Sequence, residues 1–442
     1  METVLIKALQ LILSLSILVI VHEFGHFIFA RIFKVRVEKF YLFFDPWFSL
    51  FKFKPKNSDT EYGVGWLPLG GYCKISGMID ESMDKEAMAQ PAQSYEFRSK
   101  PAGQRLLIML GGVLFNFLLA LFIYSMVLFT WGDTYMPLKN MKMGMNYSET
   151  FHEIGFVDGD ILLRADSEEL ERFDSDCFRK VVGAQTVTVL RNGKEHQIAI
   201  PDDLMQRCMR EGRGFADPNR FPMVVKGLAS ADSPAAIAGL QPGDSIVAIG
   251  GVATPTFYEA SDALMAHKDE SVAVDFYRGE SLQSLTLRPD TAGKMGVMVK
   301  FPTEIYPLET RTYNLLTAVP AGISKGVNTL RGYVGDMKYV FTKEGASSLG
   351  GFGTIANLFP AEWDWQSFWE RTAFLSIILA FMNIIPIPAL DGGHVMFLLY
   401  EVIARRKPSD KFLEYAQMAG MGLLLLLLLY ANGNDVIRAF FK

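Results

Sequence analysis

The stretch Leu18-Val-Ile-Val-His-Glu-Phe-Gly-His-Phe-Ile-Phe-Ala30 decides how the rest of the chain is interpreted. It contains the pattern H-E-x-x-H, with His22, Glu23 and His26. On an α-helix, residues four apart lie about 40° apart around the axis, so both imidazoles leave on one face. This spacing suits two ligands of one zinc ion, and the glutamate beside them can take a proton from bound water.

The surroundings of this motif are apolar. Between Ala8 and Ala30 the only titratable residues are the three of the motif. At about 1.5 Å per residue the run can cross a bilayer, and ionisable residues at membrane depth usually mark function. A solvated face of a soluble helix would not explain this setting. A cleaved signal peptide is disfavoured, because residues 1–3 lack a basic region and the apolar run is long.

A second unusual stretch, N-I-I-P-I-P-A-L-D-G-G-H at residues 383–394, lies in another apolar run. Its two prolines cannot sit in an undisturbed helix, so the backbone must open, which in a membrane requires burial in protein or a polar cavity. Asp391 is therefore a lone carboxylate beside a broken helix, and we expect it to be the third zinc ligand. We expect His394 to pack or hydrogen-bond nearby, because a catalytic zinc keeps one position open.

Together, H-E-F-G-H and N-x-x-P-x-P-x-L-D-G-G resemble the signature of the site-2 protease family of intramembrane zinc metalloproteases. The resemblance covers essentially the whole chain. It implies one Zn²⁺ per chain, bound by His22, His26 and Asp391. It also implies that Glu23 is the general base and that Asn383 acts in catalysis by holding the substrate or the developing oxyanion.

Residues 37–104 are too polar to span a membrane but are rich in aromatic residues. Residues 62–75 alternate glycine and apolar residues, which favours short β-hairpins. A small cytosolic β-unit would fit this pattern. The family resemblance implies instead a membrane-embedded sheet whose edge holds an unwound substrate by main-chain hydrogen bonds. The substrate contacts expected from the resemblance are Gly70, Gly71, Asn383 and Pro386.

Apolar runs and flanking charges predict four membrane spans with both termini outside the cytosol. The spans are placed at residues 1–36, 105–132, 368–404 and 415–434. The second contains Gly112-Val-Leu-Phe-Asn116, which fits the family's G-x-x-x-N motif. We expect its glycines to permit close helix packing and its asparagine to form a hydrogen bond between helices.

Two similar phrases lie 84 residues apart in the charged region that follows the second span. They are G-F-V-D-G-D-I-L-L from Gly155 and G-L-Q-P-G-D-S-I-V from Gly239. This repeat predicts two copies of one domain, at residues 133–217 and 218–305. Both resemble PDZ domains, the first degenerately. A PDZ groove can bind a peptide as an added strand, but we favour a steric filter above the active site as the role of the tandem.

Residues 306–367 are expected to hold an amphipathic helix, on the outer membrane surface or against the insert, and then a glycine-rich segment. The helix is predicted from an apolar stripe of Leu316, Ile323, Val327, Leu330, Val334, Met337 and Phe341. The chain has three cysteines, and Cys177 and Cys208 could pair if the insert is extracytoplasmic.

The predicted fold is a multi-pass α-helical membrane protein with a membrane-associated β region and two extracytoplasmic PDZ-like α+β domains. The chain has 442 residues, of which half are hydrophobic, and its net charge of −5 gives no basic surface for nucleic acid. The resemblance implies a bacterial inner-membrane protease, with its PDZ-like domains in the periplasm. Its substrates would be single-pass membrane proteins of the anti-sigma-factor type, already cleaved once, and leftover signal peptides. A membrane-anchored PDZ adaptor with a vestigial metal site and a metal transporter are the alternatives.

Overall fold

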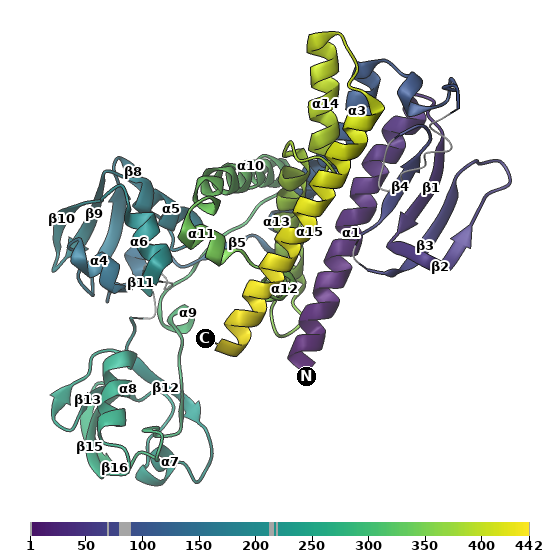
Figure 1. Ribbon diagram of the computed structural model, residues 1–442. Coiled ribbons are helices and arrows are strands. Elements are labelled where there is room, and N and C mark those ends of the chain that lie inside the picture. The colour runs from purple at the N-terminus through teal and green to yellow at the C-terminus, as the bar shows by residue number, and fades with distance from the viewer. Residues whose placement is uncertain (1, 69, 79–89, 212–215, 218–219, 442) are drawn as a thin grey trace. The chain divides into compact units, whose positions relative to one another are not determined.

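Figure 1 shows the computed structural model of the chain. It describes residues 2–441 except for residues 69, 79–89, 212–215 and 218–219. The chain forms two compact units, one of Met1–Gly132 with Thr312–Lys442 and one of Asp133–Arg311. The expected boundary between the two copies, at residues 217 and 218, falls at the edge of the described residues.

Three helices of the first unit are long and apolar enough to cross a membrane, within the part of the chain that the structure describes. They are α1 (Glu2–Ile32), α3 (Ala102–Trp131) and α15 (Asp410–Phe441). Glycines allow α1 and α3 to approach closely: a Cβ atom added to Gly25 would lie 2.2 Å from the carbonyl oxygen of Gly111. Small residues at such a crossing bring the two backbones into contact.

The apolar run that contains the two prolines forms two helices, α13 (Trp365–Ile384) and α14 (Asp391–Ala404). The segment 385–390 between them is not helical. It includes Ala389 at a φ of +80°, in the left-handed region that non-glycine residues seldom adopt. The break therefore places the aspartate of the motif at the first residue of α14.

The amphipathic segment forms α10 (Leu315–Val340), which is followed by the short helices α11 (Lys343–Ser348) and α12 (Phe352–Ala356). At the two ends of the predicted apolar stripe the side chains are open to their surroundings, since Leu316 is 86% exposed and Phe341 is 91% exposed. The helix packs against α3 and α13, and its buried residues are small: Ala318, Gly322 and Gly326. Helices approach one another more closely through small side chains than through large ones.

The first unit also carries a four-stranded sheet with the order β2-β3-β1-β4. Its strands are β1 (Val37–Leu42), β2 (Phe44–Phe53), β3 (Glu61–Leu67) and β4 (Tyr72–Ile75), and the short helix η1 (Phe97–Ser99) precedes α3. Antiparallel pairs join β2 to β3 and β1 to β4, as in hairpins, but β1 and β3 are parallel. The edge strand β2 exposes aromatic side chains, with Trp47 90% exposed.

The second unit contains two similar modules (Figure 1). The first module comprises β6 (Asn146–Tyr147), α4 (Glu149–Glu153), β7 (Ile161–Ala165), β8 (Glu168–Glu169), α5 (Ser175–Gly183), β9 (Thr186–Arg191), β10 (Lys194–Ala199), α6 (Leu204–Glu211) and β11 (Ala216–Asp217). The second comprises β12 (Met223–Leu228), α7 (Pro234–Ala238), β13 (Ser245–Ile249), β14 (Val252–Ala253), α8 (Phe257–Ala266), β15 (Val272–Arg278), β16 (Ser281–Leu287) and β17 (Val297–Val299).

Each module has its own sheet and its own buried apolar core. The main sheets have the orders β10-β9-β7-β8 and β16-β15-β13-β12-β17. The remaining elements of the unit are β5 (Asp133–Tyr135), η2 (Leu138–Asn140), α9 (Pro302–Ile305) and β18 (Glu309–Arg311). Strands β5 and β18 pair with each other, so the two ends of the unit lie side by side.

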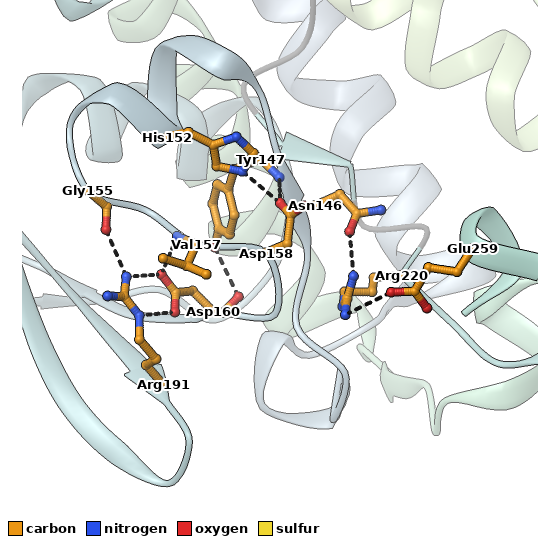
Figure 2. A network of polar contacts seen from close by, with 10 residues as sticks. All are labelled: Asn146, Tyr147, His152, Gly155, Val157, Asp158, Asp160, Arg191, Arg220 and Glu259. Atoms are coloured by element: carbon orange, nitrogen blue, oxygen red, sulfur yellow. Dashed lines mark hydrogen bonds and ion pairs between the residues drawn. The ribbon is translucent and has the colours of Figure 1, made fainter. Parts of the chain in front are cut away.

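The repeated sequence phrase corresponds to a repeated contact. In the first module Asp160 is 1% exposed, and its two carboxylate oxygens accept hydrogen bonds from Nε and Nη2 of Arg191, both at 2.7 Å (Figure 2). In the second module Asp244, also 1% exposed, accepts the equivalent bonds from Arg278 at 2.9 and 2.7 Å. The aspartate of G-D in each phrase therefore binds an arginine of a later strand in its module through a bidentate ion pair.

We expect Asp244→Asn to lower the free energy of unfolding of the second module by about 2 kcal/mol, because Arg278 then loses its charged acceptors. Asp160→Asn should destabilise the first module in the same way and leave the second unchanged. Hydrogen exchange of the full-length protein in increasing urea, read separately from peptides of each module, measures both effects. Asp232→Asn, an exposed carboxylate of the second module, is the control.

The same aspartate makes the second module sensitive to acid. Burial alone would raise the pKa of Asp244, but hydrogen bonds from Arg278 and from the backbone N–H of Gln241 outweigh it and hold the pKa below its ordinary value. The stabilisation is therefore present at neutral pH and is lost as the pH falls below about 4. Asp244→Asn should weaken this acid dependence, and an unchanged acid profile would contradict the assignment.

Cys177 on α5 and Cys208 on α6 are both buried in the core of the first module, and both are thiols. Burial raises the pKa of Cys177 to about 12 and the pKa of Cys208 to about 11. The disulfide that the sequence left open is not formed in this structure.

Candidate metal centre

Two helices and the broken segment bring three possible metal ligands together. His22 and His26 lie one turn apart on α1, as their spacing requires, and Asp391 is the first residue of α14. The Nε2 atoms of the two histidines are 3.2 Å apart. Oδ2 of Asp391 lies 3.1 Å from Nε2 of His22 and 3.3 Å from Nε2 of His26. Within the described ranges this is the one such cluster with metal-ligating side chains.

The cluster fits a zinc ion. Zinc bonds of about 2.0 Å in a tetrahedron place neighbouring ligand atoms about 3.3 Å apart, close to the three separations observed. Oδ2 of Asp391 is buried and makes no well-aligned hydrogen bond to any residue that the structure describes. A buried carboxylate oxygen without a donor is costly unless a cation or a proton satisfies it. Two imidazoles and one carboxylate are also ligands that zinc prefers.

Contacts on the far side of each imidazole orient the histidines. Nδ1 of His26 lies 2.8 Å from the backbone carbonyl oxygen of Ile108, so Nδ1 carries the proton and Nε2 presents its lone pair to the cluster. The side-chain amide of Asn116 on α3 lies 3.3 Å from Nδ1 of His22. The expected hydrogen bond between helices is therefore present, and it reaches the candidate site.

The amide of Asn116 also has a buried oxygen, Oδ1, without a partner among the described residues. Rotating the amide by 180° exchanges its oxygen and nitrogen and lets Oδ1 accept the Nδ1 proton of His22. This orientation satisfies the buried oxygen and leaves Nε2 of the histidine free for a metal. Asn116 thus accepts the Nδ1 proton of His22, just as the backbone carbonyl of Ile108 accepts the Nδ1 proton of His26.

We expect Asn116→Leu to weaken zinc binding by about 10- to 100-fold, the usual effect of losing a partner of a ligating histidine. Asn116→Asp should restore most of the affinity, because a carboxylate oxygen also accepts the Nδ1 proton. Competition with a chelator measures both variants. Ser125→Ala, which removes another buried polar side chain from α3, is the control, and equal affinities in Asn116→Leu and wild type would rule out the orienting contact.

A cavity of about 650 Å³ opens beside the cluster. It is lined by the three clustered side chains and Glu23, by Gly71 and all four residues of β4, and by Asn383 and His394, among others. The side chain of Glu23 hydrogen-bonds with the backbone of Cys73, which lies on β4. The glutamate of the motif therefore lies between the cluster and the edge of the sheet.

The structure separates the four expected substrate contacts into two pairs. Gly71 and Asn383 line the cavity, whereas Gly70 and Pro386 are not among the described residues that line it. Gln417 on α15 also lines the cavity, and it is a polar residue that the sequence analysis did not single out. The sequence could have indicated it, because a single glutamine in an apolar run is costly in a membrane and, like the aspartate beside the prolines, usually marks a functional contact.

Membrane-length helices, two buried histidines clustered with an aspartate and an adjacent glutamate define a membrane-associated zinc metalloprotease. A family model described as "Peptidase family M50" matches residues 10–427, and the chain belongs to that family. This confirms the site-2 protease type of enzyme and its zinc cofactor, which the sequence predicted. The chain is thus a membrane protein with several candidate membrane helices and with β-sheet regions.

Curated relatives cover nearly the whole chain. The "Regulator of sigma-E protease RseP" of Escherichia coli strain K12 is 28% identical over 97% of both chains. The "Protease RseP" of Yersinia pestis is 28% identical over 99% of this chain and 100% of its own length. A protein of Neisseria meningitidis named "Putative zinc metalloprotease" is 27% identical over 97% of this chain and 98% of its own.

Proposed function

We propose that this protein cleaves single-pass membrane proteins within the bilayer, with zinc held by His22, His26 and Asp391. The observation that carries the proposal is the position of the three ligand atoms, 3.1–3.3 Å apart at the wall of a cavity that β4 also lines. Ligands, glutamate and a strand edge therefore border one space, as peptide hydrolysis requires.

The chemistry follows from the groups around this space. Bound zinc would supply Lewis acidity and make water acidic enough to lose a proton near neutral pH. The carboxylate of Glu23 takes that proton and later delivers it to the leaving amide nitrogen. The side-chain amide of Asn383, which also lines the cavity, donates a hydrogen bond to the oxyanion that develops at the cleaved carbonyl.

The substrate is held as an added strand on β4. One side of β4 pairs with β1, and β4 is the end of the sheet, so its other side has no strand partner among those described. A helical substrate hides its amide bonds, whereas an extended segment beside β4 presents them to Glu23. Gly70, Gly71, Asn383 and Pro386 are the proposed contacts to this segment.

The larger organisation proposed is that of a bacterial inner-membrane protease with four spans and both termini in the periplasm. In this proposal the broken α13–α14 region provides the third span, and α1, α3 and α15 provide the others. The two modules of the second unit are PDZ-like domains in the periplasm that exclude substrates with an intact outer domain. The names of the relatives that regulate sigma E support substrates of the anti-sigma-factor type, cleaved once beforehand, and remnant signal peptides are a further class.

The test is cleavage of two single-span substrates by the purified full-length protein in detergent, with and without a zinc chelator. The substrates share one membrane segment, and only one of them carries a folded domain on its periplasmic side. Chelator-sensitive cleavage of the short substrate is expected, with little cleavage of the long one. Equal cleavage of both would reject the size filter alone. The absence of both zinc and cleavage would favour the membrane-anchored adaptor with a vestigial metal site.

A further inference from the structure

The segment that carries Asp391 into the cluster is strained. Ala389, two residues before the aspartate, has a φ of +80°, a conformation that costs an alanine on the order of 1 kcal/mol or more. Leu390, at the start of α14, supplies no side-chain cap to that helix. Contacts from outside the segment must therefore hold this backbone in place and, with it, the position of the carboxylate.

The helix α15 makes two such contacts, one turn apart. Oε1 of Gln417 accepts a hydrogen bond from the backbone N–H of Ala389 at 3.1 Å. Gly420 lies against the backbone of Pro388, and a Cβ atom added there would be 1.8 Å from the proline carbonyl oxygen. The backbone of α15 thus packs directly against Pro388, and its Gln417 side chain accepts the hydrogen bond from the N–H group of the strained Ala389.

The two residues of α15 that make these contacts are also more buried than the rest of the helix. Gln417 and Gly420 are the only buried residues of this helix, among those whose burial the structure describes. Gln417 is 4% exposed, although the helix is otherwise largely open to its surroundings. A glutamine at this depth is costly unless it forms a specific bond, and the bond it forms is to the segment beside the cluster.

We propose that Gln417 is a positioning residue for Asp391 and that α15 holds this carboxylate in ligating geometry through residues 388–390. The inference rests on the proposed zinc ligands. It assigns to α15, which contributes no ligand, control over the shape of the metal site. Removing the Gln417 acceptor should let residues 388–390 relax and should move Oδ2 of Asp391 out of register with the two histidines.

The experiment uses the full-length protein in detergent and four variants: Gln417→Leu, Gln417→Glu, Gly420→Ala and Met418→Leu. Zinc affinity is measured by competition with a chelator, and the coordination geometry is measured from the visible absorption of the Co²⁺-substituted protein. Gln417→Leu and Gly420→Ala should bind zinc about 10- to 100-fold more weakly and should shift the Co²⁺ spectrum. Gln417→Glu keeps an oxygen acceptor on a side chain of equal length, so it should keep the zinc affinity and the Co²⁺ spectrum of the wild type. Met418→Leu, on the exposed face, should change neither.

Unchanged zinc affinity and an unchanged Co²⁺ spectrum in Gln417→Leu would overturn the inference. If Gln417→Leu fails to fold, Gln417→Asn takes its place, because it keeps the amide but is too short to reach Ala389. His22→Ala distinguishes a failure of this inference from a failure of the proposed zinc ligands. If His22→Ala binds zinc as tightly as wild type, the ligand assignment is wrong. If His22→Ala loses zinc and Gln417→Leu does not, only the role of Gln417 is wrong.

Discussion

Glu23→Gln is expected to lower kcat for cleavage of a single-span substrate by about a thousandfold while zinc binding is retained. Glutamine has nearly the same shape as glutamate, so the packing of α1 beside the cluster should persist. Its amide cannot accept a proton from water at neutral pH, and this is the step assigned to the carboxylate. The loss should therefore appear in kcat, with little change in KM.

The position of Glu23 makes this prediction specific. Its side chain lines the cavity beside the cluster and contacts the backbone of β4, where the substrate is proposed to bind. Initial rates and zinc content are measured on the same preparation. Glu2→Gln, the same change at the exposed start of α1, is the control and should leave both unchanged. Cleavage by Glu23→Gln at the wild-type rate would show that another group activates the water.

Asp391→Ala is expected to abolish both zinc binding and cleavage. The aspartate is the one anionic member of the cluster, and its Oδ2 lies within 3.3 Å of both histidine nitrogens. Without it, two neutral imidazoles remain to hold a divalent cation, which is fewer ligands than a catalytic zinc site uses. The loss of zinc affinity should exceed the 10- to 100-fold or so expected for a partner outside the ligand set.

The matched control is Asp45→Asn. Asp45 lines the same cavity, so it tests whether any carboxylate there would hold the metal. Its oxygens accept hydrogen bonds from Tyr72 and Ser49, at 2.8 and 2.9 Å, so its role in the structure is already accounted for. Asp45→Asn should retain one zinc ion per chain. Full zinc occupancy in Asp391→Ala would remove this residue from the ligand set and leave the two histidines in need of another partner.

Much of the site could be predicted from the sequence because the relevant rules act over short distances. Four residues make about one helical turn, so the spacing of His22 and His26 alone places both on one face of α1. The missing N–H group of proline is equally local, and it explains the break before Asp391. The repeated G-D phrase predicted two similar modules, and Asp160 and Asp244 do make equivalent ion pairs.

Other features depended on surfaces that meet only after folding. The apolar stripe of α10 predicted an amphipathic helix, but it did not reveal that the buried residues would be small ones where the helix packs against α3. The glycine pattern of the sheet predicted hairpins, but it carried no information about the parallel pairing of β1 with β3. Such pairings depend on which distant edges meet, and no local pattern encodes that.

The sequence by itself determined the chemistry of this protein: two histidines and a glutamate on one helical turn, and a lone carboxylate beside two prolines, all in apolar runs. Tertiary structure alone decided that Asp391 meets the histidines, that Asn116 contacts His22, and that Gln417 contacts the segment before Asp391. The reason is physical. Periodicity and backbone breaks are set by neighbouring residues, whereas contacts between distant segments are set by how the helices pack.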